Sequence, residues 1–67
     1  MNTSQIGVPG QGTTYIEVTG KGINASIGNN IGKLEGKEVL LEGNKGVINI
    51  GGEIKGNEIT KVTSKEG

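Results

Sequence analysis

The chain has 67 residues, 14 of them glycine and 30% of them hydrophobic, and seven basic residues balance seven acidic ones. A chain of this length makes one domain and buries only about 60% of the surface that its unfolded form exposes. The sequence has no His, Cys, Asp, Arg, Trp or Phe, which excludes disulfides and removes the side chains that usually bind metals or catalyse reactions. The charges are scattered and form no basic stripe for nucleic acid. We therefore expect a protein that is not an enzyme, has no cofactor or metal and binds no nucleic-acid polymer.

Residues 1–12 are predicted to form a Gly-rich N-terminal arm, and residues 13–67 a small β domain. The arm contains Gly7, Pro9, Gly10 and Gly12, and it lacks the positive and hydrophobic segments of a secretion signal. No apolar run in the chain is long enough to cross a bilayer. We expect a cytoplasmic protein with no membrane partner, in the host cytoplasm if a phage encodes it.

Residues 13–19 alternate between apolar and polar side chains. Ile16 and Val18 fall on one side, and Tyr15 and Glu17 on the other. This period of two predicts a half-buried strand.

Residues 20–25 carry the only motif with a known mechanism, because Gly20, Gly22 and Ala25 match the pattern G-x-G-x-x-G/A. With Glu42 downstream, residues 14–42 resemble the opening βαβ unit of Rossmann-type dinucleotide-binding proteins. That resemblance implies a nucleotide phosphate near residues 20–25 and a ribose near Glu42. The same glycines are also typical of a turn between two strands, which is the interpretation that the short chain favours.

Residues 23–34 fit either a helix or a strand. Ile23, Ile27, Ile31 and Leu34 have helical spacing, whereas Ile23, Ala25 and Ile27 alternate as in a strand. Gly28 and Gly32 disfavour a helix interior. We prefer a strand or irregular segment and leave room for one short helical turn.

From residue 37 onward the sequence predicts an antiparallel meander with strands at residues 37–42, 47–55 and 58–63. Hairpin turns are expected at residues 43–46 and at Gly56 and Asn57. The second turn would pair Ile54 with Ile59 and Lys55 with Glu58. Gly51 and Gly52 predict a bend within the middle strand. One face of this meander would collect the apolar residues Val39, Leu41, Ile48, Ile50, Ile54 and Ile59.

The other face of the meander is expected to carry Leu40, Val47 and Val62, which we interpret as a self-association interface. A small core without a covalent or metal link needs such support. Residues 36–47 also resemble the strand–turn–strand of small Sm-like or SH3-like barrels, a resemblance that implies a ring-forming interaction module. The predicted fold is therefore an all-β, meander-like or barrel-like unit.

A candidate ligand site follows from the Gly-rich turns, because their backbone N–H groups form anion-binding concavities. Tyr15 is the only side chain able to stack on a base, and Lys21 and Lys45 lie beside glycines. The sequence therefore predicts a homo-oligomer that binds a small anionic, nucleotide-like molecule at subunit boundaries. The alternative is an assembly element of a phage particle or another homopolymer. The predicted ligand contacts are Tyr15, Gly20, Lys21, Gly22, Asn24 and Lys45.

Overall fold

The strands of this chain pair with one another in parallel throughout. The computed structural model describes residues 1–22 and 25–66, in which there is no helix. The described residues are rich in strands and include no helix, which confirms an all-β fold, and every pairing between the named strands is parallel. The strands are β1 (Gln5–Ile6), β2 (Thr13–Val18), β3 (Ile27–Asn30), β4 (Lys33–Gly43), β5 (Val47–Ile50) and β6 (Glu53–Ser64).

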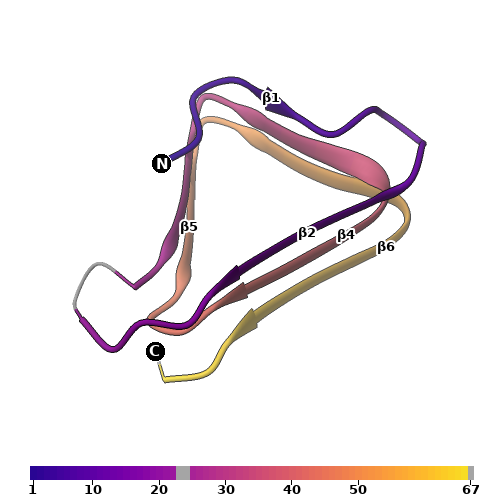
Figure 1. Cartoon of the computed structure of the whole chain (residues 1–67). Helices are drawn as coiled ribbons and strands as arrows, with labels where there is room; N and C mark the ends of the chain where they lie inside the picture. The colour runs from indigo at the N-terminus through magenta and orange to yellow at the C-terminus, as the bar shows by residue number, and fades with distance from the viewer. Residues whose placement is uncertain (23–24, 67) are drawn as a thin grey trace.

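The chain winds into coils that stack on one another, as in a parallel β-solenoid. We name residues 1–26 coil 1, residues 27–46 coil 2 and residues 47–66 coil 3. β1 and β2 pair with one edge of β4, β6 pairs with its other edge, and β5 pairs with β3. Figure 1 shows the triangular outline of the coils, with β5 along one side and β4 and β6 bent around the other two. The shortest dimension of 13 Å fits rows of strands that lie about 4.8 Å apart.

Glycines allow the chain to turn the corner between two sides of the triangle. Gly51 has a φ of 63°, a left-handed conformation that glycine adopts at little cost. A Cβ on Gly32 would lie 2.8 Å from the side-chain oxygen of Asn29. The bend expected at Gly51 and Gly52 is confirmed, since β5 ends at Ile50 and β6 begins at Glu53. Because each corner redirects the chain, the alternation of inward and outward side chains does not continue from one side to the next.

The core is a short column of aliphatic side chains inside the coils. The buried hydrophobic residues are Ala25, Ile27, Leu34, Val39 and Leu41. All except Ala25 form one cluster, against which Ile16, Val18, Val47 and Ile54 pack. Most of this core belongs to coil 2, because only coil 2 is covered on both of its edges.

The predicted antiparallel meander is wrong. Leu41 lies beside Val62 and Ile54 beside Leu34, and the described strands β5 and β6 do not pair with each other. Glu58 forms its ion pair with Lys37, at 3.3 Å, and Lys55 pairs in register with Glu35. The turns at residues 43–46 and at Gly56 and Asn57 are corners of the coil, so the strands after them continue in the same rotational sense. The sheets do not close into a barrel.

The apolar face predicted for the meander is consequently divided. Val39 and Leu41 are buried and Ile54 is half-buried inside the coil. The other three residues of that face are exposed on the outside, namely Ile48, Ile50 and Ile59.

The ambiguous segment is extended where it is described. Residues 27–30 form β3, and β4 starts at Lys33, whereas Ile23 and Asn24 lie outside the described residues. β2 and β4 are parallel, as the Rossmann resemblance implies, but the described part of the connection between them contains β3 and no helix. A βαβ unit is therefore wrong for this chain. The alternation predicted for β2 is confirmed, with Ile16 and Val18 half-buried and Tyr15 and Glu17 exposed.

Residues 1–12 lie along coil 2 of the same chain. β1 pairs with β4, and Asn2 bridges to Asn29 through backbone hydrogen bonds with Gly28 and Asn30. Lys37 and Glu38 both donate backbone hydrogen bonds to the carbonyl oxygen of Gly12. These bonds fix the start of the chain as the first part of coil 1.

Ile31 is strained, and replacing it should stabilise the protein. Its φ of 68° lies in the left-handed region, and its side chain is 74% exposed. This conformation costs a β-branched residue about 1–2 kcal/mol, whereas asparagine tolerates it. We expect Ile31→Asn to raise the free energy of unfolding by about 0.5–1 kcal/mol, measured by urea denaturation. Ile50→Asn, at an exposed neighbour outside the left-handed region, is the control. Equal effects of the two changes would contradict strain at Ile31.

Candidate functional site

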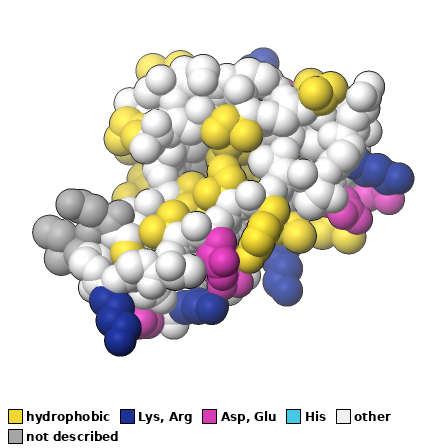
Figure 2. Space-filling model, in the orientation of Figure 1, with side chains coloured by type: hydrophobic (Ala, Val, Ile, Leu, Met, Phe, Trp, Pro, Cys, Tyr) yellow, Lys and Arg dark blue, Asp and Glu magenta, His cyan; other side chains and the backbone are white. Residues whose placement is uncertain are grey.

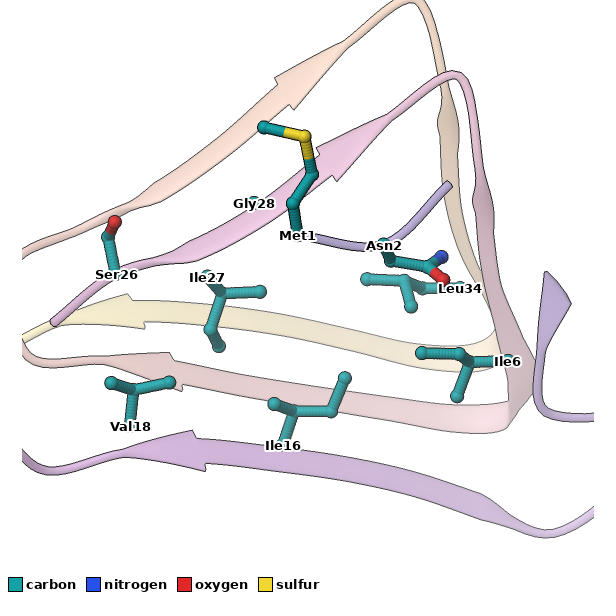
Figure 3. A pocket seen from close by; sticks show the side chains of 9 residues that line it. All are labelled: Met1, Asn2, Ile6, Ile16, Val18, Ser26, Ile27, Gly28 and Leu34. Atoms are coloured by element: carbon teal, nitrogen blue, oxygen red, sulfur yellow. The ribbon is translucent and has the colours of Figure 1, made fainter. Parts of the chain in front are cut away.

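The coil 1 end of the solenoid opens onto its apolar interior. A cavity of about 260 Å³ lies here, lined in part by Ile6, Ile16, Val18, Ile27 and Leu34. Figure 3 shows these side chains, from strands far apart in the sequence, around one hollow. The cavity exists because β1 and β2 cover two sides of the triangle, whereas Asn2 is the only described residue of coil 1 that pairs with β3. In Figure 2 hydrophobic side chains run across the middle of the molecule, and charged side chains lie below this band and at the right of the view, some of them directly beside it.

The coil 3 end exposes interior positions as well. Val62 follows Leu41 in the same inward column, yet it is 51% exposed while Leu41 is 2% exposed. Thr60 and Asn49, which follow Val39 and Asn29, are also exposed. Lys65 and Glu66 donate backbone hydrogen bonds to Gly43 and Asn44, so this last described segment continues beside coil 2 and does not cross the end. Repeat proteins normally cover such ends with a polar cap.

Each end also presents a strand with one unpaired edge. Among the described strands, β2 and β6 both pair only with β4. β6 is 12 residues long and β2 is 6 residues long. Unpaired N–H and C=O groups along such edges are a template for another strand. The two ends therefore combine an exposed apolar interior with free backbone hydrogen-bonding groups.

A ladder of three asparagines runs through the coils and gives the stack a direction. Asn2 Nδ2 donates to Asn29 Oδ1 at 2.9 Å, and Asn29 Nδ2 donates to Asn49 Oδ1 at 2.8 Å. Each amide also donates to a carbonyl oxygen of the following corner, at 2.7 Å, 2.9 Å and 3.0 Å respectively. Every step of the ladder therefore passes a hydrogen bond from one coil to the next in the same sense.

Charged side chains lie on the outer face of the sheet formed by β2, β4 and β6. The Lys65 ammonium lies 2.9 Å from a Glu42 carboxylate oxygen. This hydrogen bond holds the pKa of Glu42 below its usual value and raises the pKa of Lys65. The pKa of Tyr15 is raised, first by partial removal from water and then by the charges of Glu17 and Glu42.

The structure divides the predicted ligand-binding residues between two places. Tyr15 lies on the outside of β2 and lines a hollow of about 120 Å³ together with Leu40 and Lys61. The turn after β2 contacts the corner before β5 instead, since Asn44 Nδ2 donates to Gly20 O at 2.6 Å. Lys45 is also at that corner, where its ammonium lies 3.1 Å from Glu66.

The remaining predicted ligand residues do not extend the Tyr15 hollow or the corner that contains Lys45. Lys21 and Gly22 are exposed in the turn after β2 and do not line the Tyr15 hollow. Asn24 lies outside the described residues. Among the described residues, no group of three or more acidic, His or Cys side chains lies close enough to hold a metal.

The predicted interface residues do not share one face. Val47 and Val62 follow Ile27 and Leu41 on the inside of the coil, and both belong to coil 3. Leu40 is half-buried on the outer face of β4, in register with Lys61 of β6.

The asparagine ladder is the feature that the sequence analysis missed. The signal was a repeat of 20 residues that starts near residue 29. Asn29 recurs as Asn49, Gly32 as Gly52, and the aliphatic Leu34 as Ile54. A fixed period of this length indicates stacked coils.

Comparisons with known proteins do not identify a relative, since no family model, no curated protein and no solved structure matches the chain. None of the described residues belongs to a helix that could span a membrane. The case for a function therefore rests on the geometry of this chain alone.

Proposed function

We propose that this chain is a structural building block that associates with copies of itself through the ends of its coils. The observation that carries the proposal is the exposure of Val62, an inward residue of coil 3 that no described segment covers. The hollow beside Ile16 and Val18 supports it from the other end. Burying such surface stabilises a complex by about 25 cal/mol for each Å² of apolar area removed from water.

The small size of the core supports the same proposal. Few hydrophobic side chains are buried, and only coil 2 has neighbouring coils on both edges. A further coil on either end would convert a half-buried column into a fully buried one. Association would then supply stability that the single chain lacks.

Binding of a small anionic ligand is the alternative, and the geometry supports it less. The Lys45 ammonium is engaged by the Glu66 carboxylate. Tyr15 does not share a hollow with Lys45 or the Gly20 turn. A phosphate-containing ligand would have to displace Glu66 from the Lys45 ammonium. A base attached to that phosphate would gain no stacking on the Tyr15 ring.

Light scattering tests the proposed self-association. At micromolar concentration we expect a molar mass that is a multiple of 6.9 kDa, and a melting temperature that rises with protein concentration, because folding and association are coupled. A monodisperse species of one chain with a concentration-independent melting temperature would contradict the proposal.

A further inference from the structure

We propose that the copies stack head to tail, with coil 3 of one copy continuing into coil 1 of the next in the register that joins coils within the chain. This arrangement rests on the self-association proposed above and specifies its geometry. The partner at each end is a second copy of this chain, and β6 of one copy pairs in parallel with β1 and β2 of the next.

In three columns, the inward residues at the two ends match each other in type. Within the chain, the columns are Ile6, Leu34, Ile54; Thr14, Val39, Thr60; and Ile16, Leu41, Val62. Each of these three columns begins and ends with the same kind of side chain, whereas a fourth, Val18, Gly43 and Ser64, begins with an aliphatic side chain and ends with a hydroxyl. Head-to-tail stacking places Ile54 over Ile6, Thr60 over Thr14 and Val62 over Ile16 of the next copy. These three columns continue across the junction without a polar group facing an apolar one, whereas in the fourth column Ser64 meets Val18 of the next copy.

The asparagine ladder gives this stacking a direction. Asn49 is the last amide of the ladder, and within the described residues its Nδ2 donates only to Gly52 O. Its second N–H group remains available for the next coil. Asn2 Oδ1 of the following copy is an acceptor at the matching position, where it already receives the backbone N–H of Ser4 at 3.2 Å and the Ser4 hydroxyl at 3.5 Å. The donor at one end therefore meets an acceptor at the other.

A two-fold arrangement would lose both matches. It would bring identical ends together and reverse the direction of the strands across the junction. The inward Ile, Thr and Val residues of coil 3 in one copy would then face those of the other copy in the reverse order along the strand. The interior columns would be interrupted, because their spacing along β6 is not symmetric.

The outer charges are compatible with the head-to-tail register. Lys65 of coil 3 pairs with Glu42 of coil 2 in its own chain. Since Glu17 is in register with Glu42, and Glu42 with Thr63, the Glu17 carboxylate of the next copy falls above Thr63, beside Lys65. In the same register Lys61 lies against Tyr15 of the next copy, where a cation and an aromatic ring attract each other.

Head-to-tail contacts are heterologous and produce an open chain of copies. On the third side of the triangle, the described residues of coil 1 supply Asn2 but no strand. Each junction therefore keeps a recess between β5 of one copy and β3 of the next.

Two variants that each block one end test the arrangement. Ile6→Lys places a charge in an inward position of coil 1 that is 37% exposed, and Val62→Lys does the same in coil 3. Circular dichroism checks that each is folded. In light scattering, each variant alone should have the mass of one chain, because one of its ends is blocked. An equimolar mixture should form a species of two chains, built from the intact coil 3 of Ile6→Lys and the intact coil 1 of Val62→Lys.

Matched controls carry the same substitution away from the inward columns. Val8 and Ile48 are each 54% exposed, in the loop after β1 and on the outside of β5. Val8→Lys and Ile48→Lys should assemble as the unchanged protein does. Equal loss of assembly in these controls would overturn the proposed register.

The outcomes separate this proposal from the one on which it rests. If the unchanged chain is monomeric, the proposed self-association fails. If it assembles and either blocked variant alone still forms dimers that do not change on mixing, the contact is two-fold and the head-to-tail arrangement is overturned.

Asn49→Asp replaces Val62→Lys if that variant does not fold. It keeps the size of the side chain and the acceptor for Asn29, but it can donate neither to Gly52 O nor to the next copy. Its association constant should fall roughly tenfold, as for the loss of one buried hydrogen bond. An unchanged association constant would overturn the proposed ladder across the junction.

Discussion

Leu41→Asp is expected to unfold the protein, whereas Ile50→Asp is expected to leave it folded. Leu41 is 2% exposed and lies between Ile16 of coil 1 and Val62 of coil 3. An isolated carboxylate there loses its hydration and gains no partner, at a cost of several kcal/mol. That cost is comparable with the whole stability of a small domain. The strand signal in circular dichroism should be lost at neutral pH.

Ile50 serves as the matched control because the same substitution meets water there. Its side chain is 58% exposed on the outside of β5. Surface changes of this kind usually alter the free energy of unfolding by less than about 0.5 kcal/mol. Urea denaturation measures both variants. If Ile50→Asp proved as damaging as Leu41→Asp, the outward facing of β5 would be wrong.

Asn29→Asp should cost the protein at least about 3 kcal/mol of unfolding free energy, because two donated hydrogen bonds are replaced by repulsion. Asn29 is 1% exposed, and its Nδ2 donates to Gly32 O and to Asn49 Oδ1. A carboxylate has no hydrogen to donate and would face both acceptors. The destabilisation should be visible in urea denaturation at pH 7.

The pH dependence of this variant has a definite sign. Burial favours the neutral form of the introduced carboxyl group and raises its pKa in the folded state above that in the unfolded state. The variant should therefore regain stability as the pH falls through the pKa that this carboxyl group has in the folded state. It should lose stability as the pH rises above the pKa that the group has in the unfolded state. Asn30→Asp, at a half-buried neighbour, is the control and should change the unfolding free energy by less than about 0.5 kcal/mol. Equal losses at positions 29 and 30 would contradict the ladder.

The sequence by itself determined that the fold is all-β and which side chains of β2 point inward. Glycine-rich turns between runs of β-branched residues predict strands, and a period of two separates Ile16 and Val18 from Tyr15 and Glu17 whatever the partner strand is. The inward positions Val39 and Leu41 could also be predicted, because their alternation is local to one straight side of the coil.

Only the tertiary structure decided which strands pair and in which direction. A period of two is the same in parallel and antiparallel sheets, and the glycines at residues 43–46 suit a hairpin as well as a corner. The partner of Leu41 is Val62, 21 residues away, and no turn residue between them specifies that contact. The corner at Gly51 and Gly52 then resets the alternation, which puts Ile48 and Ile50 outside while Ile54 points inside. The candidate site depends on this stacking, because an exposed interior exists only once the coils define an inside.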